Sequence, residues 1–188
     1  MFSEETERIK KIRSKYRQPS VDIIMKLQLK KMTKGKMFIQ VLKNGKIAHT
    51  FLKLNEDLKA VISGPNLRGP FKTILSVSNI GSVTKDPQQT KTKKLDQKLI
   101  NFLFIINDKQ KKPLLTFVAQ NEKQFANWSD GFRYLIGKPI EESITQNAID
   151  ELIDVDTEIE LFDSPKISPV LPPPPIDLNF KVKTTQFL

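Results

Sequence analysis

The chain has 188 residues, of which 38% are hydrophobic and 28% are charged, and it contains 12 phenylalanines. This composition supplies one hydrophobic core, so it excludes a mostly disordered chain and a large multidomain enzyme. Because cysteine is absent and His49 is the single histidine, disulfides, thiolate metal sites and histidine-rich metal centres are excluded as well.

The charge of the chain is unevenly distributed. Residues 1–138 hold 28 Lys and Arg against 11 Asp and Glu, whereas residues 139–188 hold 3 against 10. The basic part predicts contact with a polyanion such as a membrane, a nucleic acid or an acidic protein, although a lysine-rich surface kept for solubility explains the same bias. No apolar run approaches the roughly 20 residues that span a bilayer, and Met1–Lys15 is charged rather than signal-like. We therefore expect a cytoplasmic protein.

Two helices are predicted before Gly35. Ser3–Tyr16 reads as a basic helix, and Gln18-Pro19 breaks it because proline disfavours helical geometry in the residue before it. Ser20 can then cap a second helix that runs to about Met32. The apolar residues of this second helix recur at three-and-four spacing on one face. They are Ile23, Ile24, Leu27 and Met32.

After Gly35 the apolar pattern changes to the alternation that is typical of strands. Asn44-Gly45 lies between two such runs and is a strong hairpin signal. Asp108–Lys112 is a charged turn between the two most apolar runs. Seven strands are expected. They are Met37–Leu42, Ile47–Leu54, Leu58–Ser63, Thr73–Val77, Gly81–Lys85, Leu99–Asn107 and Pro113–Ala119.

One helix follows the strands at Glu122–Ile136, with Asn121 as its cap and Gln124 three residues further on, as in a capping box. Its apolar stripe consists of Phe125, Trp128, Phe132 and Leu135. A further, acidic helix is predicted within Thr145–Phe162. The chain thus divides into an N-terminal helical extension (1–34), a domain (35–138), the acidic helix (139–163) and a proline-rich tail (164–188).

Seven short antiparallel strands followed by a helix with a central tryptophan, here Trp128, is the order of elements in pleckstrin homology (PH) domains. Over Gln18–Phe180 the chain also resembles the C-terminal region of the ELMO (engulfment and cell motility) family. The matching segments are Gln18-Pro19 with the helix that runs into Gly35, then Trp128–Gly131, Leu135–Lys138, the acidic helix and Pro172–Pro175. The resemblance implies an α+β fold, mainly β. Its centre would be a PH-like seven-stranded antiparallel sandwich or barrel capped by a C-terminal helix, with additional flanking helices and the proline-rich tail.

The same resemblance implies a non-enzymatic adaptor. ELMO proteins bind DOCK-family guanine-nucleotide exchange factors, and the pair activates Rac to remodel actin in engulfment and cell motility. In that family the helices flanking the PH domain pack with a helical segment of the DOCK partner, and the proline-rich tail docks on the partner's SH3 domain. Family members carry a helical-repeat region and an ELMO domain upstream, and neither fits into the first 17 residues. The chain is therefore expected to be a fragment or a short relative.

Two interaction sites follow from these expectations. The partner-helix groove is assigned to apolar residues of both flanking helices: Ile23, Ile24, Leu27, Ile149, Leu152 and Ile153. Alternatively, these residues pack on each other or on the PH helix. The SH3 ligand is assigned to the overlapping P-x-x-P units of the tail and a preceding cation: Lys166, Pro169, Pro172 and Pro175. A stiff spacer that binds nothing is the alternative there. Trp128 is assigned to the core rather than to a contact.

The sequence predicts no catalytic residue, cofactor or metal, because it lacks phosphate-loop, dinucleotide, nucleophile-elbow and zinc-protease motifs. It also lacks the aromatic patterns of nucleic-acid binding modules, so neither a nucleic acid nor a small-molecule substrate is expected. The runner-up function is a PH domain that is recruited to anionic membranes, such as the plasma membrane, without a DOCK partner. Its candidate lipid contacts are exposed cations that attract such a surface diffusely: Lys43, Lys46, Lys91, Lys93, Lys94 and Lys98.

Overall fold

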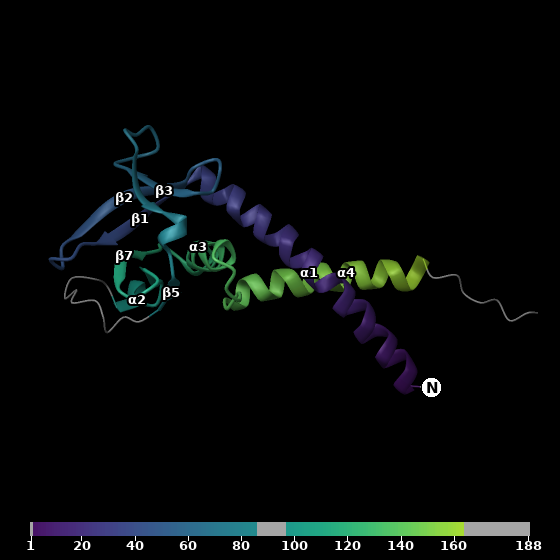
Figure 1. The fold of residues 1–188 in the computed structure, drawn as a ribbon. Coiled ribbons are helices and arrows are strands. Elements are labelled where there is room, and N and C mark those ends of the chain that lie inside the picture. The colour runs from purple at the N-terminus through teal and green to yellow at the C-terminus, as the bar shows by residue number, and fades with distance from the viewer. Residues whose placement is uncertain (1, 86–96, 164–188) are drawn as a thin grey trace, which may run out of the picture.

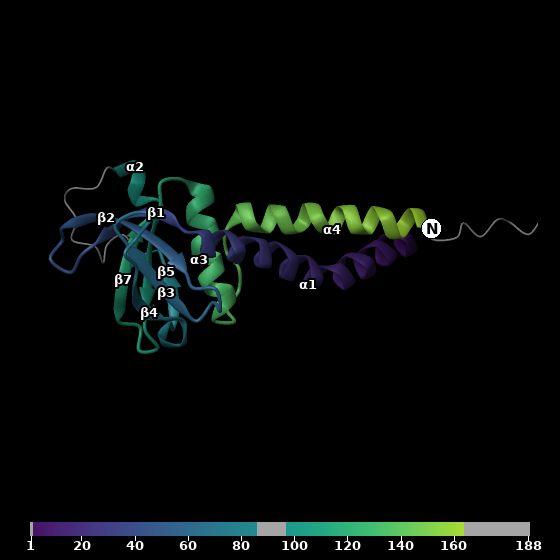
Figure 2. The same cartoon turned by 90° about the horizontal axis from the view of Figure 1, so that it is seen from above.

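The computed structural model describes residues 2–85 and 97–163 of the chain. Seven antiparallel strands form one sheet in the order β4-β3-β2-β1-β7-β6-β5, so that β4 and β5 lie at its two edges. Two long helices, α1 and α4, extend from the sheet and pack against each other; they run alongside in Figure 2 and cross at an angle in Figure 1. We call this helix pair the arm. The α+β class with a PH-like arrangement of strands is confirmed.

The bounds of the elements place the strands close to where the alternation predicts them. The strands are β1 (Lys36–Val41), β2 (Ile47–Leu54), β3 (Ala60–Gly64), β4 (Lys72–Ser76), β5 (Ser82–Thr84), β6 (Leu103–Asn107) and β7 (Pro113–Val118). The helices are α1 (Phe2–Lys34), the 3-10 turn η1 (Val77–Asn79), α2 (Gln97–Ile100), α3 (Glu122–Leu135) and α4 (Ser143–Asp163). None of these helices, within the described part of the chain, is long and apolar enough to cross a bilayer.

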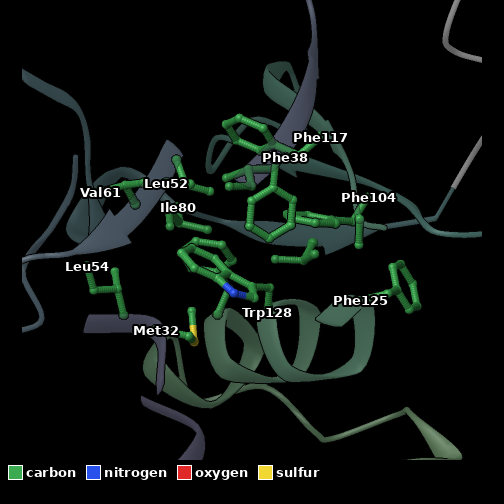
Figure 3. Close-up of a cluster of buried hydrophobic side chains, with 14 of the residues drawn as sticks. Met32, Phe38, Leu52, Leu54, Val61, Ile80, Phe104, Phe117, Phe125 and Trp128 are labelled. Carbon is green, nitrogen blue, oxygen red and sulfur yellow. The ribbon is translucent and has the colours of Figure 1, made fainter. Parts of the chain in front are cut away.

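The main core lies between α3 and one face of the sheet, as Figure 3 shows. Trp128 is 1% exposed, and its ring stands edge-on to Phe38 with the ring centroids 4.9 Å apart. Phe104 and Phe117 pack on each other and on Phe38 from the neighbouring strands. Aromatic pairs of this kind contribute about 0.5–1.5 kcal/mol each beyond the area that they bury. The apolar stripe of α3 therefore packs this helix against the sheet.

The first helix differs from the prediction. α1 is one continuous helix of 33 residues, so the expected break at Gln18-Pro19 is wrong. A proline inside a helix costs about 3 kcal/mol. Ile12 before Pro19 and Met25 and Met32 after it are buried, at 6%, 0% and 0% exposure. Burial of a side chain of this size stabilises by about 1.5–3 kcal/mol, so packing on both sides outweighs the cost of the proline.

The predicted strand Leu99–Asn107 begins later than expected. β6 starts at Leu103, and the four-residue helix α2 precedes it. Leu99 packs from α2 against Leu103, Ile105 and Val118. This cluster is separate from the core around Trp128, because alternate residues of a strand point to opposite faces. The short helix and the long α1 also make the helical share larger than the expected mainly β composition, at 48% of the described residues.

Candidate interaction surfaces

The arm consists of two antiparallel helices whose facing sides are buried. Ile149 and Ile153 of α4 are 0% and 2% exposed. In the same interface Gln28 Nε2 of α1 donates to Thr145 Oγ1 of α4 over 3.2 Å, and both side chains are buried. α1 runs toward the sheet and α4 runs away from it (Figure 2). The two helices thus stabilise each other along their length.

Ion pairs join the two helices away from the sheet. Arg13 pairs with Asp154, and Lys15 Nζ lies 2.8 Å from Glu160 Oε2. The hydrogen bond from Lys15, followed by one from Tyr16, lowers the pKa of Glu160, and the same Lys15 bond raises the pKa of Lys15. Both charges therefore persist at neutral pH. Because the groups are exposed, these pairs set the register of the helices more than their stability.

A hydrogen bond also joins the arm, at Asp22 of α1, to the PH core, by which we mean the sheet together with α3. The hydroxyl of Tyr134 in α3 donates to Asp22 Oδ1 over 3.0 Å. Burial, followed by this hydrogen bond and the charge of Asp22, raises the pKa of the Tyr134 phenol. The phenol therefore remains a donor at neutral pH, and it links α3 to a polar position of α1.

A buried charge network fixes the start of α4. Asp130 and Arg133 of α3 are 0% and 3% exposed, and Arg133 Nη1 lies 3.2 Å from Asp130 Oδ1. Asp130 accepts the backbone N–H groups of Glu141 and Glu142 at 3.0 and 3.2 Å. The carboxylate of Asp130 thereby holds the two residues that directly precede α4.

Glu142 extends this network to the sheet. Its carboxylate lies 3.1 Å from Arg133 Nη1 and 2.6 Å from Lys85 Nζ. Arg133 Nη2 also donates to the backbone carbonyl of Val83 in β5 over 3.4 Å. Charge-assisted hydrogen bonds of this kind are stronger and more directional than neutral ones. The network therefore sets the direction in which α4 leaves the domain.

An apolar stripe remains exposed on the outside of the arm, and we call it the arm stripe. Its members are Ile23 (47% exposed), Leu27 (52%), Val155 (52%), Ile159 (53%) and Phe162 (81%). In α1 the two residues are four apart, and in α4 the spacing is four and three, so each set lies along one side of its helix. Exposed apolar side chains that repeat along one side of a helix are typical of interaction surfaces.

Helix geometry shows where the arm stripe lies on each helix. Each residue of an α-helix is rotated by about 100° from the one before it. Leu27 directly precedes the buried Gln28, so it lies about 100° from the side of α1 that faces α4. Val155 and Phe162 follow the buried Ile153 by two and nine residues, which places them about 200° and 180° from it, on the side of α4 that points away from α1. The arm stripe therefore consists of one exposed apolar face on each helix.

The residues assigned to the partner-helix groove therefore fall into two groups. Ile23 and Leu27 are exposed, and Ile24 and Leu152 are half-buried. Ile149 and Ile153 are covered by α1, so a partner could reach them only if the two helices separated. The sequence pattern did not single out Val155 and Phe162, although their spacing from Leu152 is the signal that could have found them.

The residues predicted to contact lipids or an SH3 domain lie outside the arm. Lys43 and Lys46 are exposed at the tip of the β1–β2 hairpin, beside Leu42 (37% exposed) and Ile47 (38%). Lys98 lies on α2. Two groups fall outside the described residues: the loop cations Lys91, Lys93 and Lys94, and the tail residues Lys166, Pro169, Pro172 and Pro175.

Sequence reasoning missed the buried charges Asp130, Arg133 and Glu142. Their one signal is the spacing of Asp130 and Arg133, which are three residues apart in the same helix. Across the described residues, no group of three Asp, Glu or His side chains is arranged to hold a metal ion. The polar groups that the structure brings together thus orient the arm.

Comparison with known proteins finds partial similarity to two relatives and to one solved structure. Over 62 residues, or 33% of this chain, the sequence is 32% identical to engulfment and cell motility protein 1 and to engulfment and cell motility protein 2 of Homo sapiens. The match covers 8% and 9% of those relatives, so the chain spans a small part of their length. A solved structure, the inner membrane complex sub-compartment protein 3 from Toxoplasma gondii, aligns with 73% of this chain and 86% of that chain at 7% identity. Its TM-score is 0.36, too low to support an argument.

The sequence match that decides the family covers the whole sheet and α3. Residues 24–137, more than half of the chain, match the pleckstrin homology domain family. This range begins within α1 and ends at the glycine that follows α3, so it includes the seven strands and the tryptophan-centred helix described above. The chain therefore belongs to the pleckstrin homology domain family.

Proposed function

We propose that this chain is a non-enzymatic adaptor that binds a DOCK-family guanine-nucleotide exchange factor and thereby supports Rac activation and actin remodelling in engulfment and motility. The observation that carries the proposal is the arm stripe, an apolar surface left uncovered beside a packed helix pair. The partial identity to the two engulfment and cell motility proteins supports the choice of partner.

The chemistry of the arm stripe suits an amphipathic helix of the partner. Such a helix binds by placing apolar residues at three-and-four spacing into a groove between two other helices. Arg8, Lys11 and Lys15 line a cavity of about 410 Å³ beside the far part of α4, together with Ile12 and Glu160. We therefore expect the partner helix to be apolar along its centre and acidic at the end that lies over these cations.

The proposal is tested by titrating the DOCK helical segment, without its SH3 domain, into the full chain by calorimetry. The variant Leu27→Asp with Ile159→Asp places one charge in each half of the arm stripe. Because an unpaired charge in a desolvated apolar contact is costly, we expect affinity to fall by at least about a hundredfold.

The matched control is Ser14→Asp with Asn147→Asp, which adds the same charge at exposed positions of the same two helices outside the arm stripe. This control should bind as the unchanged chain does. Circular dichroism and thermal unfolding establish that both variants are folded. A folded arm-stripe variant with undiminished affinity would exclude the arm stripe from the interface.

A second candidate function is recruitment to anionic membranes without a DOCK partner. The observation that favours it is the β1–β2 hairpin tip, where Lys43 and Lys46 stand beside the exposed Leu42 and Ile47. Each exposed lysine near an anionic surface contributes about 1 kcal/mol. Sedimentation with phosphatidylserine vesicles separates the two functions, since Lys43→Glu with Lys46→Glu should abolish vesicle binding and leave DOCK binding unchanged. Under either function we expect a cytoplasmic protein that is recruited to the plasma membrane.

A further inference from the structure

The first helix is anchored unequally on the two sides of Pro19. After the proline, Met25 and Met32 are fully buried, and Met32 belongs to the main core cluster. Of the described side chains before it, in residues 4–18, Ile12 alone is buried. The helix begins at the end of the arm that is remote from the sheet (Figure 1). The two segments of this one helix therefore gain very different amounts of stability from packing.

Ion pairs between exposed side chains join the segment before Pro19 to α4. Arg13 pairs with Asp154, and the two side chains are 40% and 54% exposed. Lys15 pairs with Glu160, and these side chains are 62% and 31% exposed. Pairs at such exposure contribute little to stability and are screened by salt. The contact of α4 with this segment is thus the weaker part of the arm.

Pro19 is the weak point in the backbone hydrogen bonding of α1. Proline has no N–H group, so it cannot donate to the carbonyl of Lys15 four residues earlier, and its ring crowds that carbonyl. It also disfavours helical geometry in the residue before it, Gln18. A bend at Pro19 therefore breaks fewer backbone hydrogen bonds than a bend elsewhere in the interior of α1.

Ser20 is placed to begin a shorter helix. In the continuous helix its side chain is 0% exposed, and Oγ has no hydrogen-bond partner among the described residues. A buried hydroxyl without a partner is destabilising. Serine is a preferred N-cap, and in a helix that started after Ser20 its Oγ would accept the N–H of Asp22 or Ile23. A break at Pro19 would therefore satisfy a polar group that the continuous helix leaves unpaired.

We propose that α1 opens at Pro19. Residues 20–34 stay on the PH core, where the hydroxyl of Tyr134 also donates to Asp22 over 3.0 Å. Residues 2–18, which we call the cover, move away from α4 as a unit. Salt favours the open form, because it screens the ion pairs of the cover and leaves the buried apolar contacts of residues 20–34 in place.

Opening changes which side of α4 a partner can reach. Ile153 and Thr157 are 2% and 5% exposed. Asp154, next to Ile153, pairs with Arg13 of the cover, so this turn of α4 lies beside the cover. Departure of the cover exposes that turn, including Ile153 of the partner-helix groove. This consequence rests on the proposed function, whereas the hinge itself requires no partner.

Pairs of spin labels on the full chain test the two segments of α1 separately. Because the sequence has no cysteine, labelling sites can be introduced without interference. Ser14→Cys with Glu158→Cys joins exposed positions of the cover and of α4. Lys26→Cys with Asn147→Cys is the matched control, with exposed positions of α1 after Pro19 and of α4. Double electron–electron resonance measures the distribution of distances in each pair.

We expect a single short distance for both pairs at low salt. At 1 M sodium chloride, where the Debye length is about 3 Å, the cover pair should gain a population of longer distances. The control pair should keep its short distance, because the contacts around it are buried.

Two substitutions in the cover-labelled chain test the parts of the hinge. Pro19→Ala provides a donor for the carbonyl of Lys15 and should remove the population of longer distances. Ser20→Ala removes the unpaired hydroxyl of the closed form and the cap of the open form, so the ratio of open to closed should fall by at least about fivefold. Lys30→Ala, at an exposed position of the same helix, is the control and should change this ratio by less than about twofold.

Three results would overturn the proposal. A cover pair that does not respond to salt would mean that the arm stays closed. Equal changes in both pairs would mean that α1 leaves α4 as a whole. A Pro19→Ala protein that opens as readily as the unchanged chain would exclude the proline as the hinge. Since no DOCK segment is present in the measurement, these results are independent of whether the proposed function is correct.

Discussion

The sulfur of Met32 in α1 lies against the backbone of Gly131 in α3, in the space that a side chain at position 131 would occupy. Met32 is fully buried and belongs to the same core cluster as Trp128. This contact sets how closely α1 approaches the PH core, and through α1 it positions the arm. The absence of a side chain in the middle of α3 is therefore a packing requirement.

We predict that Gly131→Ala lowers the free energy of unfolding by about 1–3 kcal/mol, because the new methyl group displaces Met32 from a filled core. The sign is informative, since alanine in place of glycine inside a helix otherwise stabilises by about 1 kcal/mol. Urea denaturation followed by fluorescence measures the change. Lys123→Ala, at an exposed position of the same helix, is the control and should change stability little. A more stable Gly131→Ala protein would mean that α1 is free to move away from α3.

Much of the fold could be predicted because its signals are local. The Asn44-Gly45 hairpin has its turn where expected, with Val41 paired to Ile47. Asn121 caps α3 through a 2.9 Å bond from the N–H of Gln124 to its side chain. Alternation and capping depend on neighbouring residues only, so one sequence contains enough information for them.

The parts that could not be predicted depend on residues far apart in the sequence. Pro19 signals a helix end locally, and only the packing of α1 on α4 and on the core keeps the helix continuous. The same holds for Ile149 and Ile153, whose spacing marks an apolar face without showing that α1 covers it. A cavity lined by the end of α1 and the start of α3 brings Lys34 close to Lys123, which is far from it in the sequence, so no pattern along the chain reveals it.

We predict that Trp128→Ala lowers the free energy of unfolding by about 3–5 kcal/mol, the usual range for a large buried aromatic side chain. The ring contacts Phe38 and Phe132 with centroids at 4.9 and 5.7 Å, and its removal leaves a cavity between α3 and the sheet. Thermal unfolding measures the effect, and Trp128→Phe should lose less because it keeps most of the packing. If Trp128→Ala melted like the unchanged chain, the core would close over the gap at no cost.

We predict that Arg133→Leu destabilises the protein by about 3–5 kcal/mol, because it leaves the buried carboxylate of Asp130 without its cation and leaves Glu142 with Lys85 alone. Lys59→Ala is the control, since it removes an exposed ion pair with Asp57 at 3.9 Å and should cost less than about 1 kcal/mol. Hydrogen exchange adds a specific readout. Protection should fall at the start of α4 first, where Asp130 accepts the N–H groups of Glu141 and Glu142. Uniform loss across the protein would assign Arg133 a general role in the core.

The last prediction concerns the proline-rich tail, which lies outside the described residues. Pro169–Pro172 and Pro172–Pro175 are overlapping P-x-x-P units, and Lys166 precedes the first by three residues. Proline fixes φ near −65° and favours the polyproline form, so little conformational entropy is lost on binding. An SH3 domain binds this form through aromatic grooves for the prolines and an acidic pocket for a flanking cation. Lys166 before the prolines fixes one of the two possible orientations of the peptide.

We therefore predict weak binding, with a dissociation constant on the order of micromolar, between a Pro165–Asp177 peptide and the SH3 domain of the DOCK partner. NMR titration of the labelled SH3 domain measures it. Pro169→Ala with Pro172→Ala should reduce binding strongly because it removes the groove contacts, whereas Lys166→Glu should reduce it modestly because a single exposed charge contributes about 1 kcal/mol or less. Pro165→Ala, outside both P-x-x-P units, is the control and should leave the titration unchanged. Chemical shifts that do not respond to the changes at Pro169 and Pro172 would leave the tail as a stiff spacer that binds nothing.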